Sequence, residues 1–127
     1  MAEINRIYYN KLVRDNTPAK IEAKRKNCEV RKVTDMQELQ QELLKKVREE
    51  AASLSMTRTK EDFLEEYSDL MVTLETLIKQ LEISKEELIA ARKNNLIQKG
   101  GYKHGNFLIW SDDVDYHSDE SVQGIPI

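Results

Sequence analysis

Apolar residues recur every three or four positions along two long stretches of the chain. In residues 35–54 the recurring positions are Met36, Leu39, Leu43, Val47, Ala51 and Leu54. Such spacing places the side chains on one face of an α-helix, because the helix repeats every 3.6 residues. Residues 60–81 carry a broader apolar face with the same period. We therefore expect two long amphipathic helices.

Polar residues mark where these helices begin. Thr34 is followed three positions later by Gln37, which is the spacing of a capping box at a helix N-terminus. Thr59 is the expected cap of the helix over residues 60–81. The polar stretch 55–59 breaks the pattern between them, so we expect a short connection and antiparallel packing of the two helices.

A third amphipathic helix is expected towards the C-terminus. Ser84 and Glu87 repeat the capping-box spacing, and the pair Gly100–Gly101 follows the last periodic position. Glycine commonly ends helices because it adopts the left-handed backbone conformation without steric cost. The pattern therefore predicts a helix that starts after Ser84 and ends before Gly100.

Shorter elements are expected outside these helices. Thr17 is the predicted cap of a short helix that has Pro18 in its first turn and ends near Lys26. Residues 28–33 alternate apolar and charged side chains, which is typical of a half-buried strand, and residues 107–110 are a short apolar run. The expected fold is all-α, a helical bundle of about four main helices, to which these two segments would add a short two-stranded β-ribbon.

The composition favours one domain over residues 1–110 and an acidic C-terminal tail over residues 111–127. The chain has 127 residues, of which 34% are charged and 39% are hydrophobic, and this size suits a single domain. The only cysteine, Cys28, excludes a disulfide within one chain, so a cytoplasmic location is expected. No apolar run approaches the roughly 20 residues of a membrane span, so no membrane association is expected.

The charge is arranged in blocks along the chain. Basic residues outnumber acidic ones by nine to four in residues 1–33 and by four to none in residues 91–110. Acidic residues predominate by fourteen to seven in residues 34–90 and by five to none in residues 111–127. An acidic centre between basic flanks suits a site that holds cations and a polyanion together, although solvated helix faces would give the same blocks. The net charge of −3 argues against general nucleic-acid affinity.

Three carboxylates stand out because of where they fall on the two long helices. Glu50 lies inside the apolar stripe of residues 35–54, where an unpaired charge is costly. Glu66 and Asp69 lie in one column at the border of the apolar face of residues 60–81, where they repel each other. In antiparallel packing the three would converge on one Mg²⁺. A role in keeping the helix surface soluble would also explain the charges of Glu66 and Asp69, but it does not explain a charge at Glu50.

The third helix supplies polar groups on its inner face. Arg92, Asn95 and Lys99 fall between the apolar positions of this helix. A phosphate held opposite the acids would suit Arg92 and Asn95. Lys99 is equally explained by the helix dipole, which favours basic side chains near a helix C-terminus.

Three segments of the chain, in the right order, resemble one enzyme superfamily. The acidic pattern reads Glu49–Ser53, twelve intervening residues, and then Glu66–Asp69. Tyr9–Asp15, with Pro18 beyond, resembles the opening of one branch of the superfamily, and Lys99–Tyr102 resembles its closing basic-Gly-Gly-aromatic segment. Over roughly residues 8–110 the chain is similar to the MazG-like, or phosphoribosyl-ATP-pyrophosphohydrolase-like, superfamily of all-α nucleotide pyrophosphohydrolases.

The resemblance implies an enzyme that uses Mg²⁺ to hydrolyse a nucleoside triphosphate between the α and β phosphorus atoms. The products are the monophosphate and pyrophosphate, and removal of non-standard nucleotides is one role for such a reaction. Carried over by position, Glu50, Glu66 and Asp69 are metal ligands. Glu49 is a further ligand or the base for the attacking water.

The resemblance also suggests the substrate contacts and the assembly. Asn95 and Lys99 would meet the phosphates, together with Arg92, and Lys11 and Arg14 are further candidates. Family members usually form oligomers, and three helices with broad apolar faces cannot easily cover one another. A homo-oligomer, either a dimer or a tetramer, is therefore expected.

One position departs from the family pattern and leaves a second function open. The last glutamate of the first acidic motif is Ser53 in this chain, so the site lacks one formal charge. A water, Glu49 or Asp62 would fill that place, or the site would be weakened. The alternative is therefore a helical nucleotide-binding module with little or no activity on the same scaffold. Nucleic-acid binding through the basic N-terminal segment is a less favoured third reading.

Overall fold

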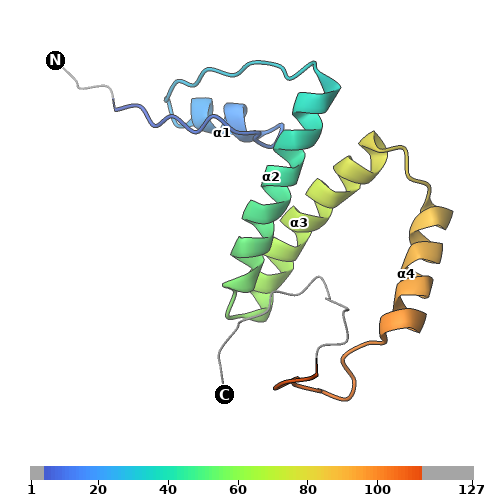
Figure 1. Cartoon of the computed structure of the whole chain (residues 1–127). Coiled ribbons are helices and arrows are strands. Elements are labelled where there is room, and N and C mark those ends of the chain that lie inside the picture. Colours follow the sequence, from blue (N-terminus) through green and yellow to red (C-terminus); the bar gives the residue numbers. More distant parts are fainter. Residues whose placement is uncertain (1–4, 113–127) are drawn as a thin grey trace. The chain divides into compact units, whose positions relative to one another are not determined.

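Residues 5–112 are the part of the chain that the computed structural model describes. Four helices and no strands form within it, so the predicted all-α fold is confirmed (Figure 1). The helices are α1 (Thr17–Ala23), α2 (Met36–Ser55), α3 (Lys60–Gln80) and α4 (Lys85–Lys99).

The described residues divide into two compact units. The first unit runs to Leu88 and holds α1, α2, α3 and the first turn of α4. The second unit begins at Ile89 and holds the rest of α4 and the segment that follows it. The predicted tail over residues 111–127 lies, from residue 113 onwards, outside the described residues.

Side-chain caps start the two long helices close to the predicted positions. The carboxylate of Asp35, one residue after the expected Thr34, accepts a hydrogen bond of 3.2 Å from the backbone N–H of Gln37. Thr59 caps α3 as predicted, since its hydroxyl accepts a bond of 3.1 Å from the N–H of Asp62. Both caps satisfy donors that a helix N-terminus otherwise leaves unpaired.

The capping box of α4 is also confirmed. The N–H of Glu87 donates to the Ser84 hydroxyl at 3.0 Å, and the Glu87 carboxylate accepts from the Ser84 N–H at 3.4 Å. The helix ends at Lys99, and Gly100 follows with a positive φ of 73°. This is the left-handed conformation that glycine adopts at helix ends.

The first helix is shorter than predicted. It begins at Thr17 itself, with Asn16 as a cap that makes no side-chain hydrogen bond, and it ends at Ala23 instead of Lys26. Arg25 takes a positive φ of 59°, and this conformation breaks the helical repeat. The N–H groups of Lys24 and Lys26 both donate to the carbonyl of Ile21, which closes the turn.

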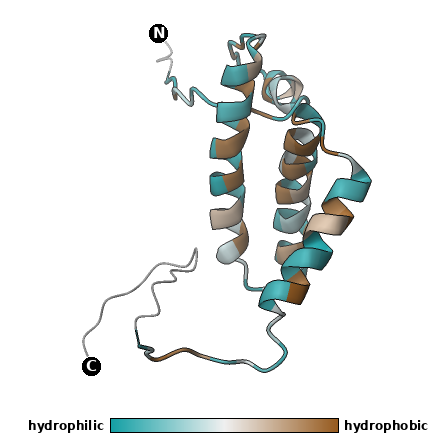
Figure 2. Cartoon of the chain, turned by 45° about the vertical axis from the view of Figure 1, so that its right-hand side comes forward, coloured by the Kyte–Doolittle hydropathy of each residue, from teal (hydrophilic) through white to brown (hydrophobic). Residues whose placement is uncertain are grey.

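The helices α2 and α3 pack against each other as an antiparallel hairpin, joined by residues 56–59 (Figure 1). Their hydrophobic positions gather on the sides that face each other (Figure 2). The buried side chains within residues 5–112 are Leu43 of α2 with Leu77 and Thr73 of α3. The side chain of Gln80 ties the open end together by donating to the carbonyl of Met36 at 2.8 Å.

The packing of α2 against α3 covers only part of the apolar face that the sequence predicts for each helix. Ala51, predicted to be in the core stripe of α2, is exposed, and so is Met36. On α3 the middle of the face is buried or half-buried, but Phe63, Leu64 and Tyr67 near its start are 44–53% exposed, and Leu81 at its end is 48% exposed. A helix pair can bury one stripe on each helix, and these faces are wider than one stripe.

The predicted β-ribbon is wrong. Residues 28–33 and 107–110 are non-helical and lack strand pairing, and all of them except the half-buried Val33 are exposed. Val30 is 54% exposed and Phe107 is 89% exposed, so neither segment buries the apolar side that a strand would need. Two strands alone are marginal in water because they gain few hydrogen bonds and bury little surface.

Within residues 5–112, no helix combines the length and the hydropathy that crossing a bilayer requires.

Truncation of the core side chains provides a test of the hairpin packing. Leu43→Ala leaves a cavity between α2 and α3, so we expect it to lower the free energy of unfolding by about 2–4 kcal/mol. Leu44→Ala, at a neighbouring position that is 54% exposed, should change it by less than about 1 kcal/mol. Urea denaturation followed by circular dichroism measures both. Equal losses for the two variants would contradict the packing.

Candidate metal centre

Three of the carboxylates singled out in the sequence come together on the α2–α3 hairpin. One carboxylate oxygen each of Glu50, Glu66 and Asp69 lie within 4.8 Å of one another, and all three residues are half-buried. Glu50 comes from α2, and the other two come from adjacent turns of α3. Because the hairpin is antiparallel, the two helices present these positions at the same level. We call Glu50, Glu66 and Asp69 the acidic triad.

Two lysines form ion pairs with the glutamates on the α2 side of the centre. The ammonium group of Lys46 lies 3.5 Å from a Glu50 oxygen and 3.1 Å from a Glu49 oxygen. The other oxygen of Glu49 accepts from Lys11, at 2.5 Å. Lys46 and Glu50 are largely covered, with side chains 15% and 16% exposed. The glutamate that the helical pattern placed in the apolar stripe is therefore paired with a cation.

The segment before α1 reaches the α3 side of the centre. The guanidinium of Arg14 lies 3.5 Å from an oxygen of Asp69, one of the triad carboxylates. Beside this contact is a groove of about 460 Å³, named here the Arg14 groove. Its lining residues are Arg14, Asp15, Asn16, Thr17, Lys20, Asp69 and Val72.

The grouping of carboxylates changes the proton affinity of Glu66. Partial desolvation raises its pKa, and the negative charges of Asp69 and Glu50 raise it further. Carboxylates that face each other in this way disfavour the charged form, because each added negative charge repels the others. A bound cation would relieve that repulsion.

Glu49 has the opposite character. Its hydrogen bonds from Lys11 and Lys46 lower its pKa, and Glu49 in turn raises the pKa of Lys11. A carboxylate stabilised as an anion is a weaker base. In the observed arrangement, Glu49 lies outside the acidic triad and is held as an ion pair with both lysines.

The acidic triad fits a small hard cation. Mg²⁺ prefers oxygen ligands at about 2.1 Å, which places neighbouring ligand oxygens about 3 to 4 Å apart. The triad oxygens lie within 4.8 Å, so small side-chain rotations would bring them into that range. The donor set contains oxygen alone, and three carboxylates leave other coordination positions for water or a ligand.

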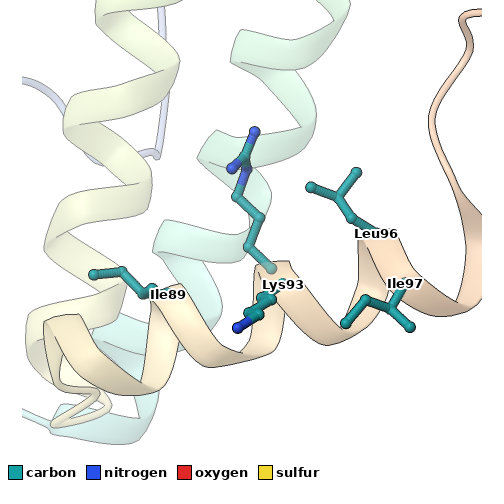
Figure 3. A pocket seen from close by; sticks show the side chains of 5 residues that line it. Ile89, Lys93, Leu96 and Ile97 are labelled. Atoms are coloured by element: carbon teal, nitrogen blue, oxygen red, sulfur yellow. The ribbon is translucent and has the colours of Figure 1, made fainter.

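The sequence-predicted residues Arg92, Asn95 and Lys99 all lie on α4, and their positions fall in the second unit. Arg92 lines a hollow on this helix, and Figure 3 labels the other four lining residues. The lining residues are Ile89, Arg92, Lys93, Leu96 and Ile97. They follow the helical repeat, so the hollow is a mostly apolar strip on one face of α4. The proximity of the three residues to the acidic triad remains a prediction.

Two basic residues of the centre were not found by sequence analysis. Lys46 precedes Glu49 and Glu50 by three and four positions, a spacing that brings side chains together on a helix, so the sequence contained its signal. Lys20 lines the Arg14 groove together with Asp69 and Val72 of α3, and no local sequence pattern indicates that arrangement.

Ser53 does not take part in the acidic triad, and it is half-buried on α2 three positions after Glu50.

No family model, curated protein or solved structure matches the chain.

Neutralising Glu66 provides a test of the carboxylate cluster. A raised pKa means that this group favours folding at low pH and opposes it as the pH rises through the folded-state value. In metal-free buffer at pH 7, Glu66→Gln should therefore raise the melting temperature, whereas Glu75→Gln, at an exposed position on the same helix, should not.

Adding Mg²⁺ should make the wild-type protein more stable than Glu66→Gln, the opposite of the order in metal-free buffer. At a concentration one hundred times the Kd, Mg²⁺ should stabilise the wild-type protein by about 2.7 kcal/mol, and Glu66→Gln should lose most of this gain. Differential scanning calorimetry measures both effects. An equal gain in the wild type and in Glu66→Gln would place metal binding elsewhere.

Proposed function

We propose that the chain is a Mg²⁺-dependent nucleotide pyrophosphohydrolase of the MazG-like type. The reaction adds water across the α–β phosphoanhydride of a nucleoside triphosphate and yields the monophosphate and pyrophosphate. The observation that carries the proposal is the convergence of Glu50, Glu66 and Asp69 on one hairpin. These are the residues that the resemblance to the superfamily assigns to the metal.

Different residues of the chain would have different roles in this reaction. Glu50, Glu66 and Asp69 would hold Mg²⁺, which would supply positive charge that stabilises the negative charge developing on the phosphate oxygens. Arg14 contacts Asp69 of the triad, and Lys11 contacts Glu49, which precedes Glu50 in α2. Both cations would contact the polyphosphate of the substrate. Glu49 orients water if a ligand draws Lys11 away from it. Arg92, Asn95 and Lys99 are the remaining candidates for phosphate contacts.

Two observations favour a second candidate function. Glu49 is paired with two lysines, and position 53 carries a serine where the family pattern has a glutamate. Both features weaken general-base and metal chemistry without removing the site. A nucleotide-binding module with little or no turnover is therefore the alternative on the same scaffold.

Turnover distinguishes the two functions. We expect the purified protein to release pyrophosphate from at least one member of a panel of standard and non-standard nucleoside triphosphates with Mg²⁺. Glu66→Gln should lower kcat/KM by about 100-fold or more, because it removes a metal ligand. Glu75→Gln should leave it unchanged. A coupled assay for pyrophosphate measures the rates.

Binding data complete this test. If the folded protein binds Mg²⁺ and a nucleotide but hydrolyses none of the panel, the enzyme proposal is wrong and the binding module is supported. If neither Mg²⁺ nor nucleotide binds, both functions are wrong.

We also propose that the chain forms a homo-oligomer. Phe63 and Tyr67 stack with ring centroids 6.0 Å apart at the start of α3, and both rings remain 44–46% exposed, next to Leu64 at 53%. Within residues 5–112 the buried apolar side chains are Leu43 and Leu77, and neither is fully buried, so a second copy would supply the missing cover. The exposed start of α3 supports this assembly.

Sedimentation velocity tests the assembly. We expect the wild-type protein to sediment as a dimer or tetramer. Leu64→Asp places a charge on the exposed apolar face and should shift the protein towards smaller species. Thr76→Asp introduces the same charge at an exposed polar position of α3 and should not. A wild-type protein that stays monomeric at high concentration would contradict the proposal.

A further inference from the structure

The Arg14 groove lies directly beside the acidic triad and shares a residue with it. Asp69 contributes one oxygen to the triad and also lines the groove. The groove has a volume of about 460 Å³, which is within the range of small-molecule sites. A ligand in the groove would therefore adjoin a cation held by the triad.

A cation bound to the acidic triad would change the net charge that the groove lining presents to a ligand. Arg14 and Lys20 are positive, and Asp15 and Asp69 are negative, so the lining is neutral as observed. A divalent cation that binds Asp69 offsets that negative charge. It also competes with the Arg14 guanidinium, whose contact to Asp69 is long at 3.5 Å. The filled site would present two cationic side chains and a metal to the groove.

The two cations are available to an anion. Arg14 has a side chain that is 56% exposed, and its ion pair with Asp69 is the only one that it forms within residues 5–112. Lys20 is exposed and forms no ion pair among the described residues. Their heads approach the groove from different positions, one before α1 and one within it.

The chemistry of the lining distinguishes between the two ends of a nucleotide. The lining includes one apolar side chain, Val72, and no aromatic ring on which a base could stack. Polar and charged groups make up the rest. A diphosphate, small and highly charged, suits such a groove, and a nucleoside does not.

We propose that the Arg14 groove binds the pyrophosphate end of the substrate, through Arg14 and Lys20, and only when a divalent cation occupies the acidic triad. This inference rests on the proposed function and adds which end of the nucleotide lies on which side of the metal. It makes Lys20 a substrate-binding residue and assigns Arg14 two alternating partners, Asp69 and phosphate.

Pyrophosphate is the probe for this site, because it is the product of the proposed reaction and is not consumed during a titration. Isothermal titration calorimetry of the full chain would measure its Kd with and without Mg²⁺, with AMP as the probe of the nucleotide end. The variants are Arg14→Gln and Lys20→Gln. Lys26→Gln is the matched control, because it removes the same charge just after α1 and outside the groove.

We expect pyrophosphate to bind the wild-type protein at least tenfold more tightly with Mg²⁺ than without it. Arg14→Gln and Lys20→Gln should each weaken this binding by about tenfold, and Lys26→Gln should not. Neither groove variant should weaken binding of Mg²⁺ alone or of AMP. That result supports a pyrophosphate site in the groove.

Three results would overturn the inference. Unchanged pyrophosphate affinity in both groove variants, in a protein that binds Mg²⁺, rejects the groove and leaves the proposed function intact. Weaker AMP binding with unchanged pyrophosphate binding assigns the groove to the opposite end of the nucleotide. Failure of the wild-type protein to bind Mg²⁺ rejects the proposed function together with the inference.

Discussion

The packing of α2 against α3 is the constraint on which the candidate site depends. The side chains that this packing buries, Leu43, Leu77 and Thr73, hold the hairpin in one register. That register brings Glu50 of one helix level with Glu66 and Asp69 of the other. The same packing therefore brings together like charges that raise the pKa of Glu66, and apolar burial has to offset their repulsion.

Around the carboxylates, basic groups approach from two directions. Lys46 comes from α2 itself, whereas Lys11 and Arg14 come from the segment before α1. Negative charge at the centre is thus compensated in part by side chains that a cation or an anionic ligand can displace. Within residues 5–112, Glu50 and Asp69 each form an ion pair with a basic side chain, whereas Glu66 forms none and its pKa is raised. The negative charge of the triad is therefore only partly compensated by the side chains around it.

Much of this arrangement could be predicted from the sequence because it depends on local rules. Helical spacing located the long helices, capping chemistry located Thr59 and Ser84, and the apolar setting of Glu50 singled it out. The failures are positions where long-range packing decides. The strand pattern of residues 28–33 found no partner, and Ala51 stayed exposed because two helices cover narrow stripes. Lys20 lines the Arg14 groove together with Asp69 and Val72 of α3, an arrangement that no local sequence pattern indicates.

The four-residue connection between α2 and α3, residues 56–59, has a consequence for the order of folding. All three triad carboxylates lie between residues 50 and 69, so they meet as soon as one helical hairpin closes. Hairpins of this kind have low contact order and close rapidly, because little chain entropy is lost in joining neighbouring segments. The three carboxylates can therefore come together through the closure of this one hairpin, and their meeting requires no residue of α4.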